Sequence, residues 1–279
     1  FPQFRKNKFH IAGESYGGHY VPRFAAEIVR QPDRTFDFAS ILVGYGITVD
    51  LTQEGAYRPM ACGEGGYKQV ITDEECENMD KIYTERCAPL VKLCYAAPTA
   101  FTCVPAQLAC SKLMEPYVNT GLNYYDIRRP CEGKLCYKEE EWVDQFLDSE
   151  FVKYVAGADP SIGEFQSCSS EIGSRFVFSG DHSKPFQQYV AELLELGIPV
   201  LLYSGDKDFI CNWLGNHAWS DALEYLGLDQ FQAASLKPYY TLINTKGGEV
   251  KNYQHFTFFS AYDAVHMVPY DPPYFALAM

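Results

Sequence analysis

A nucleophilic serine is indicated by residues 13–17, which read GESYG. Small residues on both sides of a serine let the backbone turn sharply enough to expose the hydroxyl. The surrounding residues fit this turn, because Phe9–Ala12 predicts a short β-strand before it and Tyr20–Arg30 predicts an α-helix after it. The pattern also occurs by chance, but its position between a strand and a helix favours a nucleophile at Ser15.

A serine nucleophile needs a base, and the base needs an acid that fixes its orientation. The apolar segment Ile198–Ser204 predicts a buried parallel strand, which leads directly to Asp206 and Asp208. Phe256–Tyr262 predicts another strand, and His266 follows in its exit loop. Such folds place their chemistry at the shared carboxyl edge of parallel strands. The chain order Ser, Asp, His is that of α/β-hydrolases, and on position alone either aspartate could be the acid.

The sequence as a whole resembles the serine carboxypeptidases. The catalytic blocks of that family are matched by residues 13–20 (GESYGGHY), 205–208 (GDKD) and 266–269 (HMVP). Its fungal carboxypeptidase Y branch is matched by residues 59–66 (PMACGEGG), 125–128 (YDIR) and 208–213 (DFICNW). The resemblance covers nearly the whole chain, and the family's N-terminal segment and extreme C-terminus lie outside it. It implies an α/β-hydrolase fold, with a mostly parallel central sheet flanked by helices and a disulfide-rich helical insertion. It assigns catalysis to Ser15, Asp208 and His266.

The resemblance also implies where a substrate would bind. The backbone N–H of Tyr16 would donate to the oxyanion, and a second donor is expected in a loop upstream of these residues. The pocket for the leaving group would be lined by Met267, Tyr125 and Tyr137, and the pocket for the acyl group by Ile47, Tyr57, Ile210 and Cys211.

Glu14, next to the expected nucleophile, separates this sequence from generic esterases. A carboxyl group there repels a substrate carboxylate unless one of the two carries a proton, and like-charge proximity raises a carboxyl pKa toward that state. The position therefore predicts recognition of a free C-terminus and activity favoured at acid pH. A simpler interpretation is that Glu14 complements the dipole at the start of the following helix.

The segment from Cys62 to Cys136 differs from the rest, because it holds eight of the ten cysteines. It lacks the closely spaced cysteine pairs and the histidines of a metal site, so disulfides are favoured and no metal or other cofactor is expected. We therefore expect a first part of the core at 1–50, a cysteine-rich, cap-like insertion at 51–138 and a second part of the core at 139–279. Dense disulfides indicate the secretory pathway, with secretion or a vacuole- or lysosome-like compartment as the destination.

Spacing alone cannot choose among the many pairings that eight cysteines allow. The resemblance implies the pairs Cys62–Cys76, Cys87–Cys110, Cys94–Cys103 and Cys131–Cys136. It leaves Cys168 either unpaired in this chain or bridged to an upstream segment or a second chain. It makes Cys211 a free thiol beside the acyl pocket, and a buried, inert cysteine is the alternative.

Composition and charge argue against two kinds of partner, and the resemblance implies peptide or protein C-termini as the substrate. Of 279 residues 47% are hydrophobic, which is enough for one large core. The formal net charge of -13 argues against nucleic acid, since phosphate binding depends on clustered lysine and arginine. No apolar run approaches the length of a membrane span. The first residues, FPQFR, are neither an initiator methionine nor a signal peptide, so we expect the chain to begin inside a longer protein.

Four positions depart from the family pattern. Ala264 and Val265 stand where the family has two glycines before the catalytic histidine, which adds bulk at an expected turn. His182 and Glu54 replace aromatic pocket residues, which leaves the side-chain preference open. Two other functions therefore stay open: an esterase or acyltransferase on the same fold, and a catalytically inactive fragment or homologue that lacks the upstream oxyanion loop.

Overall fold

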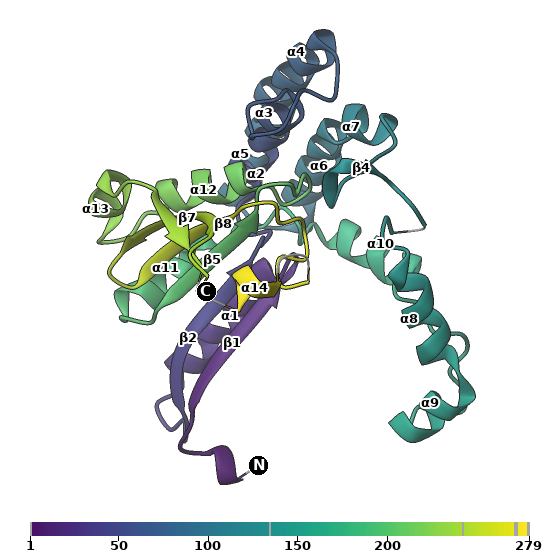
Figure 1. Ribbon diagram of the computed structural model, residues 1–279, viewed down its shortest axis with the longest axis vertical. Coiled ribbons are helices and arrows are strands. Elements are labelled where there is room, and N and C mark those ends of the chain that lie inside the picture. The colour runs from purple at the N-terminus through teal and green to yellow at the C-terminus, as the bar shows by residue number, and fades with distance from the viewer. Residues whose placement is uncertain (1, 134, 242, 271–272, 278–279) are drawn as a thin grey trace.

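A computed structural model describes residues 2–133, 135–241, 243–270 and 273–277, and its centre is one six-stranded sheet. Figure 1 shows the helices of the cysteine-rich insertion beyond the carboxyl end of this sheet, and a helical arm that extends away from it on one side. The candidate site lies where the sheet meets the insertion.

The strands are β1 (Lys8–Glu14), β2 (Asp37–Gly44), β3 (Leu122–Asn123), β4 (Asp126–Pro130), β5 (Val200–Gly205), β6 (Lys237–Tyr240), β7 (Lys246–Tyr253) and β8 (Phe256–Ala261). The helices are α1 (Gly17–Arg30), α2 (Asp50–Gln53), α3 (Tyr57–Ala61), α4 (Asp73–Ile82), α5 (Ala88–Ala96), α6 (Ala100–Cys110), α7 (Glu115–Asn119), α8 (Glu139–Asp148), α9 (Glu150–Ala156), α10 (Ser170–Ser179), α11 (Gln187–Glu195), α12 (Trp213–Ala222), α13 (Leu228–Ala233) and α14 (Pro273–Ala276). Among the described helices, none combines the length and apolar character that a membrane span requires.

The sheet has the strand order β1-β2-β5-β8-β7-β6. Its first four strands are parallel, whereas β7 and β6 are antiparallel to their neighbours. The register aligns the carboxyl ends of the parallel strands, with Glu14 opposite Gly44, Gly44 opposite Tyr203 and Tyr203 opposite Phe259. The prediction of a mostly parallel sheet is confirmed, and chemistry-bearing loops from distant sequence positions leave the sheet at one edge.

The predicted strands are present, with ends that differ from the prediction by at most two residues. β1 covers Phe9–Ala12 and extends to Glu14, and β5 and β8 cover most of the two apolar segments before the aspartates and His266. Helix α1 begins at Gly17, three residues before the predicted start. The antiparallel pair of β6 and β7 was missed, because the sequence of β7, KGGEVKNY, is rich in glycine and charge.

The main core packs α1, α11 and α12 against the sheet. It contains Val21 of α1, Leu193 of α11 and Trp219 of α12, all buried against strand residues such as Ile41 and Phe258. Continuous apolar strands bury both faces in this way when a parallel sheet is covered by helices. The core therefore fixes the strands whose ends carry the site.

The insertion has its own core, organised by disulfides. The structure contains the bonds Cys62–Cys76, Cys87–Cys110, Cys94–Cys103 and Cys131–Cys136, which are the pairs that the resemblance implies. Helices α5 and α6 lie side by side, and Val91 and Ala106 are fully buried between them. The Cys94–Cys103 bond joins the two helices, and Cys87–Cys110 joins α6 to the turn just before α5. Helix α4 begins with a capping box between Thr72 and Glu75.

Helices α8, α9 and α10 form the arm seen in Figure 1, and α10 packs beside α6 of the insertion. The division at 51–138 and 139–279 stays a prediction. In the structure, α11 is the first helix after the insertion that packs on the sheet through α1 and β5. Cys168, just before α10, is an exposed free cysteine.

Removal of the Cys87–Cys110 disulfide is expected to destabilise the protein more than removal of Cys131–Cys136. The first bond closes a separation of 23 residues and the second only 5. Loop-closure entropy predicts a loss of about 3 kcal/mol for the double alanine variant of the first pair and about 2 kcal/mol for the second. Urea titration measures the free energy of unfolding of each variant, and the m-values are compared to check that the variants unfold in the same way. Equal losses of free energy would contradict the predicted order.

Candidate active site

The turn around Ser15 has the geometry of a nucleophile elbow. Ser15 adopts a φ of 55°, which lies in the left-handed region and is unusual for a residue other than glycine. Its N–H donates to the carbonyl of Gly44 at 3.0 Å, and its carbonyl accepts from the N–H groups of Gly18 and Ile47, each at 2.9 Å. The chain thus holds the strained residue between β1 and α1 with three backbone bonds.

Gly18 is required by close packing behind this turn. A Cβ added there would lie 2.4 Å from the backbone oxygen of Ile47 and 2.7 Å from its nitrogen. Any side chain at position 18 would therefore separate helix α1 from the loop after β2. Gly17, in contrast, has room for a Cβ, so the close packing is a requirement of Gly18.

His266 and Asp208 form the acid and base pair that the chain order predicts. The Nδ1 atom of His266 donates to Asp208 Oδ2 at 2.8 Å, and Asp208 is completely buried. The backbone N–H of His266 donates to the backbone carbonyl of Tyr125 at 3.0 Å, and this bond fixes the loop that carries the imidazole. The bond to Nδ1 leaves Nε2 as the atom that can accept a proton from a hydroxyl.

The hydroxyl of Ser15 lies close to the His266 and Asp208 pair, on the side of Cys211. Among the described residues, no hydrogen bond joins it directly to His266. It interacts instead with Cys211, whose sulfur lies within 4.8 Å of ligand-type atoms of both Asp208 and His266. Catalytic hydrogen bonds are often loose without a substrate and tighten when one binds.

Asp206, the alternative acid, is occupied elsewhere. Its Oδ2 atom accepts from the ammonium group of Lys207 at 2.6 Å. Burial raises the pKa of Asp206, and Lys207 opposes this shift. The geometry therefore pairs the imidazole with Asp208, two residues further along the same loop.

The two bulky residues before His266 do not disturb its loop. Ala264 and Val265 are buried, and the Ala264 carbonyl accepts from Lys207 N–H at 2.9 Å. The left-handed conformation that glycine would favour falls on Asp263, with a φ of 55°. The turn is therefore made one residue earlier than the resemblance suggested, and position 264 accepts a side chain.

The residues expected at the leaving-group side lie together. The ring of Tyr125 is 4.6 Å from the ring of His266, and the ring of Tyr137 is 5.2 Å from that of Tyr125. Met267 follows His266 directly and is half-buried. The two tyrosine rings form an aromatic wall on one side of the imidazole.

The residues expected at the acyl side also lie together. The Tyr57 hydroxyl donates to the carbonyl of Ile210 at 2.9 Å, and Ile47 is tied to the Ser15 carbonyl. Cys211 is 2% exposed, and burial raises the pKa of its thiol well above the usual range. The structure thus places Cys211 next to the serine as a protonated, buried thiol.

Two tyrosines near Glu14 were not found from the sequence. Tyr203 donates its hydroxyl to Glu14 Oε1 at 3.1 Å, and Tyr45 also hydrogen-bonds to this carboxylate. Tyr45 has a φ of 35°, and its ring lies 4.3 Å from that of His266. The Gly-Tyr-Gly sequence at the end of β2 was the available signal, since flanking glycines often permit a strained residue.

The other histidines lie outside the acid and base pair. His19 is buried, and its two ring nitrogens contact backbone oxygens of Ile47, Asp181 and His182. Burial lowers the pKa of His217, which is paired with Asp221 at 3.4 Å. His10 bonds to Ser40 at 2.7 Å on the outer part of the sheet.

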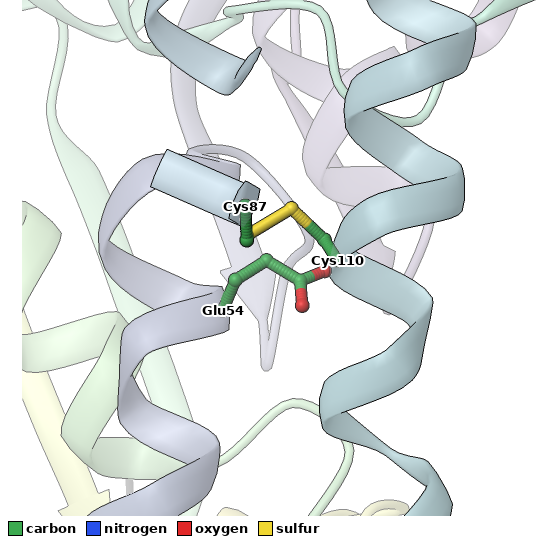
Figure 2. A group of neighbouring side chains, drawn as sticks. All are labelled: Glu54, Cys87 and Cys110. Carbon is green, nitrogen blue, oxygen red and sulfur yellow. A yellow bond between two sulfur atoms is a disulfide. The ribbon is translucent and has the colours of Figure 1, made fainter. Parts of the chain in front are cut away.

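Within the described part of the chain, three groups bring together side chains of metal-ligand type, and two of them fit a metal poorly. In one, Glu54 faces the Cys87–Cys110 disulfide, whose sulfurs are bonded to each other (Figure 2). In another, the raised pKa of Cys211 disfavours the thiolate that a metal needs. The third group, around His182, is treated below.

The comparisons with known proteins agree with this geometry. The sequence matches the serine carboxypeptidase family over residues 1–279. The chain belongs to the serine carboxypeptidase family. It is 50% identical over 286 residues to the vacuolar serine-type carboxypeptidase ATG42 of Saccharomyces cerevisiae, a match that covers 100% of this chain and 56% of that protein. It is 49% identical over 276 residues to carboxypeptidase Y of Komagataella phaffii, covering 98% and 52%. This serine carboxypeptidase chain spans about half the length of the curated relatives it matches.

A solved carboxypeptidase is also similar in structure. The crystal structure of Kex1(delta)p, a prohormone-processing carboxypeptidase from Saccharomyces cerevisiae, superposes with a TM-score of 0.75 and 25% sequence identity, over 96% of this chain and 60% of that one. The expected α/β-hydrolase fold is confirmed. The comparisons give no support to a second chain as the partner of Cys168.

Proposed function

We propose that the protein hydrolyses C-terminal peptide bonds as a serine-type carboxypeptidase through an acyl-enzyme. The observation that carries the proposal is the 2.8 Å bond from His266 to the buried Asp208, at the edge of the sheet where the strained Ser15 turn also lies. Membership of the serine carboxypeptidase family supports the same reaction class.

In this mechanism Nε2 of His266 takes the proton of Ser15 as its oxygen attacks the scissile carbonyl. Asp208 accepts from Nδ1–H and stabilises the imidazolium that forms. The N–H of Tyr16 donates to the oxyanion, and the loop upstream of β1 is the expected source of the second donor. His266 then protonates the leaving amine, and water releases the acyl group with His266 again as the base.

Glu14 is proposed to recognise the free carboxylate of the substrate. Its carboxyl group is exposed beside Ser15, and Tyr203 and Tyr45 fix its position by hydrogen bonds. Two carboxyl groups in contact share a proton most readily at acid pH, which is why acid conditions are expected to favour activity. The aromatic wall of Tyr125 and Tyr137 would hold the departing residue together with Met267. The acyl group would be held by Ile47, Tyr57, Ile210 and Cys211.

The full-length protein is expected to hydrolyse a blocked dipeptide with a free C-terminus far faster than the same dipeptide amidated. The reason is that the amide cannot share a proton with Glu14. The rates of the two peptides at pH 5, measured by release of the C-terminal residue, test this. Equal rates, or faster turnover of simple esters and amides alike, would favour the esterase or acyltransferase alternative. No turnover of any substrate would favour an inactive homologue.

We propose a vacuolar or similar secretory-pathway location. Four disulfides require an oxidising compartment during folding. The similar ATG42 protein is described as vacuolar. An acid compartment of this kind also fits the expected pH preference.

A further inference from the structure

A buried acidic cluster on the acyl side has no part in the chemistry proposed above. It consists of Asp50, Glu54 and His182, and we call it the acidic cluster. The Nε2 atom of His182 lies 3.7 Å from Asp50 Oδ1 and 3.8 Å from Glu54 Oε1. Asp50 is 2% exposed and Glu54 7%, whereas the His182 side chain is 26% exposed. The imidazole therefore connects two buried carboxylates to the surface.

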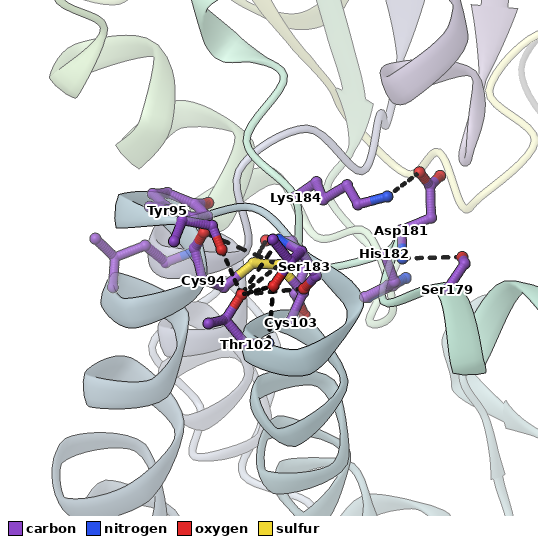
Figure 3. The surroundings of a disulfide bond; sticks show 12 residues. Cys94, Tyr95, Thr102, Cys103, Ser179, Asp181, His182, Ser183 and Lys184 are labelled. Carbon is purple, nitrogen blue, oxygen red and sulfur yellow. Dashed lines mark hydrogen bonds and ion pairs between the residues drawn. A yellow bond between two sulfur atoms is a disulfide. The ribbon is translucent and has the colours of Figure 1, made fainter.

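Each carboxyl group of the cluster has one polar neighbour, the Ser183 hydroxyl for Asp50 and His182 for Glu54, and its second oxygen has none in the ranges that the structure describes. Among the described residues, Asp50 Oδ2 and Glu54 Oε2 are buried oxygens without a hydrogen-bond partner. Figure 2 shows the Glu54 carboxylate beside the Cys87–Cys110 disulfide, which has no hydrogen to donate. Figure 3 shows Ser183 beside the Cys94–Cys103 disulfide, and His182 on the side of Asp181. A buried carboxylate oxygen without a donor is unfavourable, so an added donor would be bound strongly.

The charge of the cluster is negative at neutral pH. Burial raises the pKa of Asp50 to about 6, and the nearby His182 opposes this rise. Burial lowers the pKa of His182, but the Asp50 and Glu54 carboxylates outweigh burial and raise it to about 9. The cluster holds two carboxyl groups and one imidazole, so its acidic groups outnumber its single basic group. A single additional cation would neutralise the cluster.

The cluster lies beside the nucleophile. The ring of His182 is 6.1 Å from the ring of Tyr16, the residue after Ser15. The Glu54 charge acts on the thiol of Cys211, and that thiol contacts the Ser15 hydroxyl. Glu54 also acts on Tyr57, which lines the acyl side. A side chain on the acyl residue would extend from Ser15 along this wall toward the cluster.

We propose that the acidic cluster binds the side chain of the penultimate residue of a substrate and selects lysine or arginine there. The inference rests on the proposed function, because that function places the penultimate residue on Ser15 as the acyl group. An ammonium or guanidinium group supplies both the missing donors and the missing positive charge. An aliphatic side chain leaves the two carboxylate oxygens bare, and a glutamate adds a charge of the wrong sign.

The test uses full-length protein and N-blocked dipeptides that end in leucine and differ only in the penultimate residue. Lysine is compared with norleucine, which has nearly the same length without the charge, and with glutamate. At pH 7 we expect kcat/KM to be highest for lysine and lowest for glutamate. The Glu54→Gln variant is expected to lower the lysine-to-norleucine ratio roughly tenfold, and Asp50→Asn to lower it as well. His182→Gln should raise the ratio, because it removes the competing cation.

The matched control is Glu77→Gln, the same substitution at an exposed position of α4, which should leave the ratio unchanged. If Glu54→Gln does not fold, the opposite shift in His182→Gln decides the question. A ratio that stays within about twofold in every variant would overturn the inference. A divalent-cation site would overturn it as well. In that case the rates of hydrolysis would fall when EDTA is added and return with Zn²⁺, and the lysine-to-norleucine ratio of kcat/KM would stay constant. Absence of hydrolysis of every peptide by the unmodified protein would count against the proposed function instead.

Discussion

Replacing Ser15 with alanine is expected to lower kcat for hydrolysis of a C-terminal peptide bond by roughly 10⁴-fold or more. The proposed reaction passes through an ester on the Ser15 oxygen, and no neighbouring group can replace that oxygen. Cys211 is adjacent, but burial raises its pKa well above the usual range, so it stays protonated and weakly nucleophilic. The change removes one oxygen from a half-buried residue, so the melting temperature should hardly move.

The control for this variant is Ser174→Ala, which removes a hydroxyl from an exposed position on α10. Its kcat and melting temperature should equal those of the unmodified protein. Steady-state kinetics of both variants in the full-length protein give the comparison. Retention of more than about a tenth of the activity in Ser15→Ala would show that another group is the nucleophile.

The second large effect is expected for Asp208→Asn, with kcat lowered by roughly 10⁴-fold and KM little changed. Asp208 is completely buried and accepts the Nδ1–H of His266. An amide at this position keeps the shape but favours the wrong tautomer of the imidazole, which then cannot accept the serine proton. The pH dependence of kcat/KM should also lose the limb that reports the free base.

Asp206→Asn is the matched comparison, because Asp206 lies at the end of the same strand. It pairs with Lys207 rather than with the imidazole. Its loss is expected to change kcat by less than about tenfold. A large effect at Asp206 with a small one at Asp208 would reverse the assignment that the geometry favours.

Much of the sheet and the elbow could be predicted from the sequence. The apolar runs before Asp206 and before His266 are long enough to identify buried strands, and parallel strands bring their carboxyl ends together. The serine motif added a third loop at that edge. The chain order left Asp206 and Asp208 as alternatives, and the family resemblance selected Asp208. The hydrogen bond of His266 to Asp208 in the structure agrees with that choice.

The rest depended on tertiary contacts that no local pattern encodes. The strained Tyr45 and the hydrogen bonds of Tyr203 to Glu14 arise because β1, β2 and β5 are neighbours in the sheet. The acidic cluster unites Asp50 and Glu54 of one helical region with His182 from far along the chain. The sequence indicated that His182 and Glu54 were unusual, but not that they meet.

The claim on which the account depends is that Ser15 becomes the acylated residue. A fluorophosphonate probe reacts with a serine only when a base activates its oxygen, so the position of the adduct measures that activation directly. In full-length protein treated at pH 5 and digested, the account predicts one phosphonylated peptide, modified at Ser15, and loss of hydrolysis in step with its formation. An adduct on another residue, or complete inactivation with Ser15 unmodified, would contradict it.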